Sequence, residues 1–376
     1  MKILSIVGRF NKHSGIPRYV TELAERFVKD HETHLLTTDY DYEVPNITVH
    51  KKPVIKRPYW LRILSNAYYN TKYAKNIKRE LDIDVVSSNG AESLLCDVVT
   101  MHSCHKAWNK HYRSIDIFRN ARGAIDPLNR VVLTVERHVL ERGSKKIISV
   151  SEGVKREILK NYNVPDEKIT VIPNGVDLEE FSPDPQKRIE IRNQYNIDEN
   201  DIVLLFTGYE FRRKGLEYII KALPDIGKSV KLFAVGRSNP KPFRKLANKL
   251  GVSDDIIFTG FVLEINNYYA ASDIFVFPTA YEPFGLVITE AMATGIPAIT
   301  SSLAGASELI TNGYDGLLLS DPENGNDIAE KINMLIEDEH LRKQMGKNAR
   351  KTAENYSWDE IARRTMEVYE EVQEHR

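Results

Sequence analysis

Short aliphatic runs that suit β-strands alternate with amphipathic runs that suit helices along almost the whole chain, and this alternation limits the possible folds strongly. In the first half, we predict strands at 2–7, 34–38, 47–50, 85–88, 98–101, 147–150 and 169–172. The clearest helices between them are predicted at 19–28, 61–81 and 154–162. Such alternation is typical of parallel α/β architecture, in which helices cover both faces of the sheet.

The pattern restarts after a polar stretch at 181–200, which contains Pro183 and Pro185 and reads as a linker with a short helix. Further strands are predicted at 202–207, 230–235, 256–259, 274–277, 298–300 and 316–319, and charged helices follow from 327 onward. A chain of 376 residues is long for one core, since single cores stop growing at roughly 250–300 residues. We therefore expect two Rossmann-like domains, with ligands at the carboxyl ends of their strands.

The charge is divided unevenly between the two halves. Residues 1–180 carry 29 Lys and Arg against 23 Asp and Glu, and the rest carries 23 against 30, although the whole chain has a net charge of only −1. This balance does not indicate a nucleic-acid partner. Two cysteines, Cys96 and Cys104, are too few for a disulfide framework and suit a reducing compartment. No apolar run approaches the roughly 18–20 residues that span a bilayer, so we expect a soluble protein that at most sits on a membrane surface. The expected location is the cytoplasm, including the cytoplasmic face of the membrane.

The stretch from Tyr281 to Pro297 combines a helix start with two acidic residues. Pro283 and Gly285 are expected to open a helix, and its first amide groups would make the segment 284–287 a site for a diphosphate. Glu282 precedes this helix and Glu290 lies within it. The two carboxylates could accept hydrogen bonds from ligand hydroxyl groups or could merely complement the helix dipole, and their spacing alone leaves both readings open.

A second stretch places cations just after a predicted strand. Gly208 follows the strand at 202–207, and the run Arg212-Arg213-Lys214-Gly215 stands before the next helical segment. Arginine binds a phosphate with two hydrogen bonds, and lysine acts as a point charge. An exposed basic cluster with no ligand is the alternative.

Together these two stretches resemble the retaining glycosyltransferase family 4, with its E-x7-E motif and its Arg-Lys-Gly run. The resemblance implies the GT-B fold, in which two Rossmann-like domains face a cleft. It implies a first domain at 1–180 that binds the acceptor and a second domain at 181–356 that binds the nucleotide sugar. A C-terminal helix at 357–376 is expected to pack back on the first domain. By the same resemblance, Glu282 contacts the donor sugar, Glu290 the ribose, and Lys214 the diphosphate. Either Arg212 or Arg213 supplies a further phosphate contact, because Tyr209 stands where the family often has arginine.

Other positions match the family in the same order. The resemblance implies a nucleobase contact at Val262, in Gly260-Phe261-Val262. It implies that Gly15 approaches the donor in the first loop, where the family usually has two glycines and this chain has Ser14-Gly15. His102, at the end of the strand 98–101, matches a histidine that contacts the donor sugar near the reacting carbon. The donor-binding set is therefore Gly15, Arg212, Arg213, Lys214, Val262, Phe284, Gly285, Leu286, Val287 and Glu290, and the catalytic set is His102 and Glu282.

We expect no metal and no other cofactor. The His102-Ser-Cys104-His105 run lacks the four spaced ligands of a zinc site. Asp39–Asp41 and Asp82–Asp84 contain Asp-x-Asp triplets of the kind that hold Mg²⁺ in another glycosyltransferase fold, but Asp82–Asp84 stands at the amino end of a strand, away from the expected ligand.

A basic segment near the N-terminus remains outside these motifs. From 44 to 79 there is no acidic residue, but there are nine Lys and Arg, with Trp60 and several tyrosines among them. This composition suits an anionic membrane surface, with a solvated helix face as the alternative.

The expected activity is transfer of a hexose from a UDP- or GDP-sugar to a glycan or lipid-linked acceptor, without a metal ion. A cell-surface polysaccharide or glycolipid is the expected product. The alternatives are an isomerase similar to nucleotide-sugar 2-epimerases, which share the two-domain architecture, and a non-catalytic subunit that binds nucleotide sugars.

Overall fold

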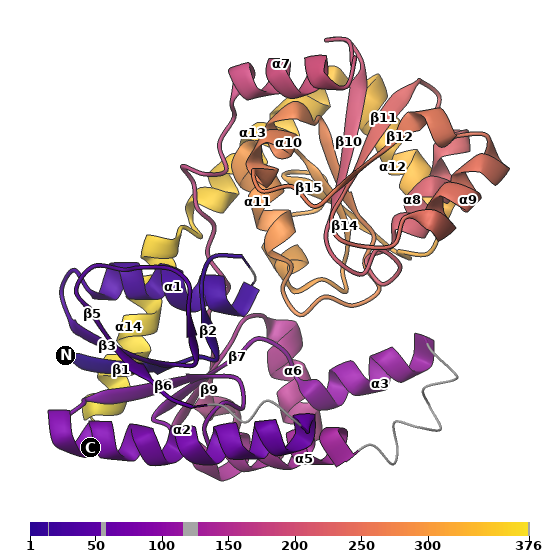
Figure 1. Cartoon of the computed structure of the whole chain (residues 1–376). Helices are drawn as coiled ribbons and strands as arrows, with labels where there is room; N and C mark the ends of the chain where they lie inside the picture. Colours follow the sequence, from indigo (N-terminus) through magenta and orange to yellow (C-terminus); the bar gives the residue numbers. More distant parts are fainter. Residues whose placement is uncertain (14, 54–57, 116–126, 375–376) are drawn as a thin grey trace. The chain divides into compact units, whose positions relative to one another are not determined.

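The computed structural model describes residues 1–13, 15–53, 58–115 and 127–374 (Figure 1). The chain divides into two compact units. The first consists of Met1–Asn174 together with Trp358–Arg376, and the second of Gly175–Ser357. Each unit is built around its own parallel β-sheet.

The first unit contains a seven-stranded sheet with the order β5-β3-β1-β6-β7-β8-β9. All its neighbouring strands are parallel. The strand order reverses between β1 and β6, because β1, β3 and β5 extend the sheet in one direction and the later strands extend it in the other. The strands are β1 (Lys2–Ile6), β3 (Glu32–Thr37), β5 (Ile47–Lys51), β6 (Val85–Asn89), β7 (Val98–Met101), β8 (Lys146–Ser149) and β9 (Ile169–Val171).

The helices of this unit are α1 (Gly15–Phe27), α2 (Tyr59–Leu81), α3 (His105–Ile115), α5 (Pro127–His138), α6 (Glu152–Asn161) and α14 (Trp358–Glu374). A π-helical turn, η1 (Val139–Gly143), extends α5, a 3₁₀ turn, η2 (Asp166–Lys168), precedes β9, and β2 (Arg9–Phe10) pairs with β4 (Asp39–Tyr40). Helix α14 packs against α1. Its Tyr369 lies 2.7 Å from Ser87 of β6 through the two hydroxyl oxygens, which fixes the helix on the sheet.

The second unit contains a six-stranded parallel sheet with the order β12-β11-β10-β13-β14-β15. Here the order reverses between β10 and β13. The strands are β10 (Ile202–Thr207), β11 (Val230–Val235), β12 (Ile256–Gly260), β13 (Ile274–Phe277), β14 (Ala298–Ser301) and β15 (Gly316–Leu319). All the strands that we predicted from the sequence of both halves are confirmed.

Helices lie on both sides of this second sheet, with α8, α9 and α12 in one group and α10, α11 and α13 in the other (Figure 1). They are α7 (Pro185–Gln194), α8 (Leu216–Ala222), α9 (Lys241–Leu250), α10 (Ile265–Ala271), α11 (Leu286–Thr294), α12 (Gly325–Glu337) and α13 (Glu339–Glu354). Short 3₁₀ turns lie at η3 (Leu223–Asp225), η4 (Ser253–Asp255) and η5 (Gly305–Leu309). Among the described residues of both units, no helix combines the length and the hydropathy that are needed to span a membrane.

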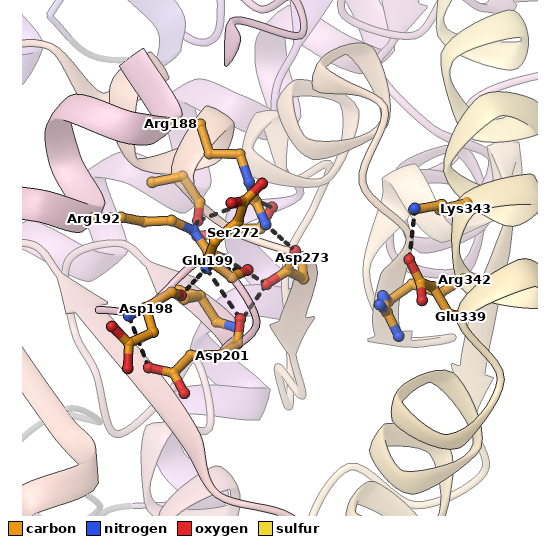
Figure 2. Close-up of polar contacts among 12 residues, drawn as sticks. Arg188, Arg192, Asp198, Glu199, Asp201, Ser272, Asp273, Glu339, Arg342 and Lys343 are labelled. Atoms are coloured by element: carbon orange, nitrogen blue, oxygen red, sulfur yellow. Dashed lines mark hydrogen bonds and ion pairs between the residues drawn. The ribbon is translucent and has the colours of Figure 1, made fainter. Parts of the chain in front are cut away.

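Within the second unit, an ionic network fastens α7 to the segment that precedes β13 (Figure 2). Asp273, just before β13, accepts from Arg188 at 2.7 Å through one carboxylate oxygen and from Arg192 at 2.7 Å through the other. The second oxygen also accepts from the backbone amide of Val203, at the start of β10, at 2.8 Å. The Arg192 side chain is only 4% exposed and donates further to the carbonyl oxygen of Ala271 at 3.0 Å. Removal of one partner from such a network lowers the stability of the fold, because it leaves an uncompensated charge in the interior.

Candidate functional site

The candidate site of the second unit lies where its strand order reverses. In open parallel sheets, ligands bind outside the carboxyl ends of the strands at such a point. The loop after β10 carries Gly208 and Lys214, and the loop after β13 carries Glu282. Because β10 and β13 are neighbours in the sheet, these two loops lie side by side.

Lys214 lies folded over Gly208. A Cβ atom at Gly208 would lie 2.5 Å from Cδ of Lys214, and the backbone there has a φ of +149°, so a larger residue would displace the lysine. The Lys214 ammonium lies 5.1 Å above the centre of the Phe277 ring and is 12% exposed along its side chain. The lysine side chain is therefore held between Gly208 and the Phe277 ring.

The Glu282 carboxylate contacts two cationic side chains. Lys214 Nζ and Arg213 Nη1 each lie 3.4 Å from Glu282 Oε2. Arg213 also donates to the carbonyl oxygen of Tyr281 at 2.5 Å and pairs with Glu210 at 3.0 Å. The predicted residues Arg213, Lys214 and Glu282 thus form one cluster. The Arg212 side chain, by contrast, is exposed, so of the two arginines left open by the sequence it is Arg213 that contacts this cluster.

The helix start predicted near Glu282 is confirmed. Gly285, with a φ of +99°, directly precedes α11, and Leu286 and Val287 are its first residues. The Phe284 carbonyl oxygen accepts from the amide of Ala306 at 2.8 Å, and the Glu282 carbonyl oxygen accepts from Gly305 at 2.9 Å, which fixes the loop on η5. The first amide groups of a helix have no partner within it and carry a partial positive charge, so this end of α11 suits an anion.

Glu290 is held by a residue that the sequence analysis missed. Tyr269 Oη donates to Glu290 Oε2 at 2.9 Å and lies 3.1 Å from the carbonyl oxygen of Val287. Tyr269 is completely buried and packs edge-on against Phe181, with ring centroids 5.5 Å apart. No spacing pattern relates Tyr269 on α10 to Glu290 on α11, because the two helices meet only through the fold.

Two glycines, Gly236 and Gly260, lie at the ends of β11 and β12. The Gly236 amide donates to the carbonyl oxygen of Gly260 at 2.9 Å, and a Cβ at Gly236 would collide with the carbonyl oxygen of Gly208. Val262 is half-buried in the following loop. Next to it, the Arg237 guanidinium lies 4.4 Å above the ring of Phe261, which is 42% exposed. Gly260 is exposed and has no atom within 4 Å of the position that a Cβ would take, so a flat group has room beside the backbone there.

In the first unit, His102 follows β7 directly. Its Nε2 lies 3.2 Å from Oδ1 of the buried Asn89, and Asn89 Nδ2 donates to the carbonyl oxygen of Ile6 at 3.3 Å. That second bond orients the amide so that Oδ1 accepts from Nε2 and leaves Nδ1 as the acceptor of the imidazole. The ring also packs edge-on against Tyr19, with centroids 4.9 Å apart. Burial lowers the pKa of His102 to about 4, so its imidazole is neutral near pH 7.

The remaining predicted positions in the first unit are Gly15 and the aspartate triplets. Gly15 is the exposed first residue of α1, and its neighbour Ser14 lies outside the described residues. Asp84 accepts from the backbone amide of Lys2 at 2.8 Å, and Asp39 pairs with Arg9 at 3.4 Å. These contacts give both aspartates a structural role within the first unit.

The contact between Tyr269 and Glu290 gives a prediction for donor binding. The change Tyr269→Phe removes one hydrogen bond to a carboxylate, so we expect KM for the nucleotide sugar to rise about 5-fold, with little change in kcat. Steady-state kinetics with varied donor measure this. Tyr268→Phe is the matched control, because Tyr268 Oη bonds Tyr195 Oη at 2.9 Å instead. Equal changes of KM in the two variants would contradict the assignment of Glu290 to the donor.

Comparison with known proteins identifies relatives over the whole chain. The family model described as Glycosyl transferases group 1 matches residues 187–352, and that described as Glycosyltransferase Family 4 matches residues 13–180. An uncharacterised glycosyltransferase of Methanocaldococcus jannaschii is 30% identical over 99% of both chains. The crystal structure of WaaG, a glycosyltransferase of lipopolysaccharide biosynthesis, aligns with a TM-score of 0.79 over 98% of this chain and 99% of that one, at 21% identity. The structure of Anabaena HepE with UDP-glucose aligns with a TM-score of 0.76 over 99% and 100%, at 22% identity.

Proposed function

This chain belongs to glycosyltransferase family 4, and we propose that it transfers a hexose from a UDP- or GDP-sugar to a glycan or lipid-linked acceptor, with retention of the anomeric configuration. Membership of the family makes it a transferase and decides against the epimerase alternative. The observation that carries the proposal is the cluster of Arg213, Lys214 and Glu282 at the reversal point of the second sheet. The UDP and glucose seen with HepE fit the same class of donor.

The chemistry of this cluster suits departure of a nucleoside diphosphate. As the bond between the sugar and the diphosphate breaks, negative charge grows on the leaving oxygens. Lys214, Arg213 and the first amide groups of α11 are preorganised donors for that charge, and such preorganisation is usually the largest single contribution to catalysis. Glu282 lies on the same cluster and is assigned to the hydroxyl groups of the donor sugar, and Glu290 to the ribose.

The proposal includes independence from metal ions. In a metal-dependent transferase, a divalent cation neutralises the diphosphate. Here two cationic side chains, 3.4 Å from one shared carboxylate, provide positive charge at that place. We therefore assign no metal and no other cofactor to the reaction, with the nucleotide sugar as co-substrate.

The acceptor is assigned to the first unit, together with Gly15 and the neutral imidazole of His102. Two relatives are named for the polysaccharides on which they act: the lipopolysaccharide glucosyltransferase of Escherichia coli and a capsular polysaccharide biosynthesis glycosyltransferase of Staphylococcus aureus. They are 28% and 31% identical to this chain over 58% and 57% of it. We propose a cell-surface glycan or glycolipid as the product and a cytoplasmic location for the enzyme.

The test is release of nucleoside diphosphate from a panel of UDP- and GDP-sugars. We expect slow release from at least one donor, at the same rate with EDTA as without it. Release that stops with EDTA and returns with Mg²⁺ would overturn the metal-free assignment. No release and no binding with any donor would overturn the transferase proposal and favour a non-catalytic subunit. The anomeric configuration of the product, read by NMR, tests retention.

We propose further that helix α2 binds an anionic membrane surface, the partner expected from the composition of this segment. Its outer side presents Leu64, Tyr68 and Tyr69, which are 39%, 57% and 37% exposed. The exposed cations Lys72, Lys75 and Arg79 lie on the same helix, whereas Lys56 and Arg57 lie outside the described residues. Aromatic and basic side chains on one helix favour insertion at a negatively charged lipid surface.

We expect vesicles that contain phosphatidylglycerol to retain the protein more strongly than vesicles of phosphatidylcholine alone. The variant Lys72→Gln/Lys75→Gln/Arg79→Gln should lose this difference, because each basic residue near such a surface contributes about 1 kcal/mol. Co-sedimentation with vesicles measures it. Matched changes at Lys245 and Lys249, exposed on α9, serve as the control. Equal retention by both kinds of vesicle would rule out the membrane surface.

A further inference from the structure

A second set of polar residues lies at the reversal point of the first sheet, and the donor motifs do not use it. Gly8 follows β1 and Glu92 follows β6, and these two strands are neighbours. A Cβ atom at Gly8 would lie 3.2 Å from Glu92 Oε1, so the glycine lets the carboxylate lie close to the end of β1. Parallel sheets bind ligands at this place.

The loop that carries Glu92 is fixed to helix α2. Asn70 is completely buried, and its Nδ2 donates to the carbonyl oxygen of Glu92 at 2.5 Å and lies 3.5 Å from Glu92 Oε2. One residue further along each segment, Thr71 Oγ1 lies 3.1 Å from Ser93 Oγ and accepts from the amide of Leu94 at 2.8 Å. The position of the carboxylate is therefore set by the fold.

Lys52 contributes a buried ammonium group near Glu92. It follows β5, is only 6% exposed, and its Nζ lies 3.4 Å from Oδ1 of Asn66, one helical turn from Asn70 on α2. Burial lowers the pKa of the Lys52 ammonium, and the charge of Glu92 opposes this shift. Burial raises the pKa of the Glu92 carboxyl, against the charges of Lys52 and Arg62 and the hydrogen bond from Asn70.

The charges of Lys52 and Glu92 each shift the pKa of the other group, but the two side chains form no direct ion pair among the described residues. A buried cation and a buried carboxylate that are not in contact are costly, because their single long contacts with Asn66 and Asn70 replace only part of the hydrogen bonding that each would have in water. Asn70 Oδ1 is also buried without a hydrogen-bond partner in the part of the chain that the structure describes. This arrangement provides a donor in the ammonium and acceptors in the carboxylate and the amide oxygen.

We propose that Lys52, Glu92 and Asn70 bind the hydroxyl groups of a sugar or cyclitol acceptor and so select the acceptor. This inference rests on the proposed transferase function. A hydroxyl group both donates and accepts, so a vicinal diol can donate to Glu92 and accept from Lys52 at once. A phosphate group would be repelled by the Glu92 carboxylate, whereas a neutral polyol can form hydrogen bonds with both Glu92 and Lys52. The charges of Lys52 and Arg62 act in the opposite direction, so inorganic phosphate is the control ligand.

The test compares nucleoside diphosphate release with and without added polyols, using methyl hexosides and myo-inositol as probes and the donor found active in the panel. We expect at least one polyol to stimulate release by the unmodified protein. In Glu92→Gln and Lys52→Met, we expect the ratio of stimulated to unstimulated release to fall about ten-fold or more. Lys51→Met, at the exposed neighbouring position, is the matched control and should keep the ratio.

Several outcomes would overturn the inference. One is a ratio that is unchanged in both variants, and another is stimulation by none of the polyols while unstimulated release continues. A third is competition by inorganic phosphate that disappears in Lys52→Met, which would identify an anion site instead. If Lys52→Met fails to fold, Glu92→Gln, which preserves the side-chain shape, decides alone. Failure of the transferase proposal is distinguishable, because the unmodified protein would then release nucleotide from no donor.

Discussion

Replacement of Lys214 by alanine is expected to lower kcat/KM for transfer by at least about 100-fold, the size of loss seen when one preorganised donor to a developing charge is removed. The ammonium lies over Gly208 and 3.4 Å from Glu282, at the end of strand β10 where the diphosphate is assigned. Its removal leaves the growing negative charge with one fewer partner. Steady-state kinetics with the donor identified in the panel measure the effect.

The same variant should fold normally, because Arg213 remains within 3.4 Å of Glu282 and prevents an unpaired carboxylate. Lys221→Ala is the matched control: Lys221 lies on the helix that follows, pairs with Glu217 at 2.7 Å and is exposed. We expect its activity to match that of the unmodified protein. A loss below ten-fold in Lys214→Ala, with an intact fold, would remove Lys214 from the leaving-group site.

The second large effect concerns stability. Arg192→Ala is expected to lower the free energy of unfolding by about 3–5 kcal/mol, because it leaves Asp273 buried with an unpaired share of its charge. The lost contacts include the ion pair to Asp273 at 2.7 Å and the bonds to the carbonyl oxygens of Ala271, Asp198 and Asp201, at 3.0, 2.9 and 3.0 Å. Urea denaturation followed by circular dichroism measures the change.

Arg188→Ala is the matched comparison for Arg192. Both arginines bind the same carboxylate at 2.7 Å from the same helix, but the Arg188 side chain is 29% exposed and that of Arg192 only 4%. Water can replace Arg188 more readily, so we expect the smaller loss there. Equal losses in the two variants, or a loss below about 1 kcal/mol in Arg192→Ala, would contradict the role assigned to the buried network.

The order of strands and helices could be predicted from the sequence because each strand is a short apolar run bounded by turn residues. The helix start at Gly285 could also be predicted, since glycine and proline punctuate the chain locally. The pair Glu282 and Lys214 could not be predicted from their spacing of 68 residues, and only the resemblance to a family predicted that both contact the donor.

Contacts between distant elements account for what the sequence did not reveal. Tyr269 reads as an ordinary apolar position of a helix, and its bond to Glu290 exists only because α10 and α11 pack together. Lys52 and Glu92 likewise stand 40 residues apart, and α2 connects them because Lys52 contacts Asn66 and Glu92 contacts Asn70, one helical turn further along. The choice between Arg212 and Arg213 also depended on which side chain turns toward the Glu282 loop.

Calorimetric titration of UDP and GDP into the unmodified protein and into Lys214→Ala shows whether Lys214 lies at the donor diphosphate. We expect one nucleotide to bind the unmodified protein and to bind Lys214→Ala at least about ten-fold more weakly, as for a lost hydrogen bond to a charged group. Lys221→Ala should bind that nucleotide as the unmodified protein does. Binding of neither nucleotide, or equal affinity in all three proteins, would contradict a donor diphosphate site at Lys214.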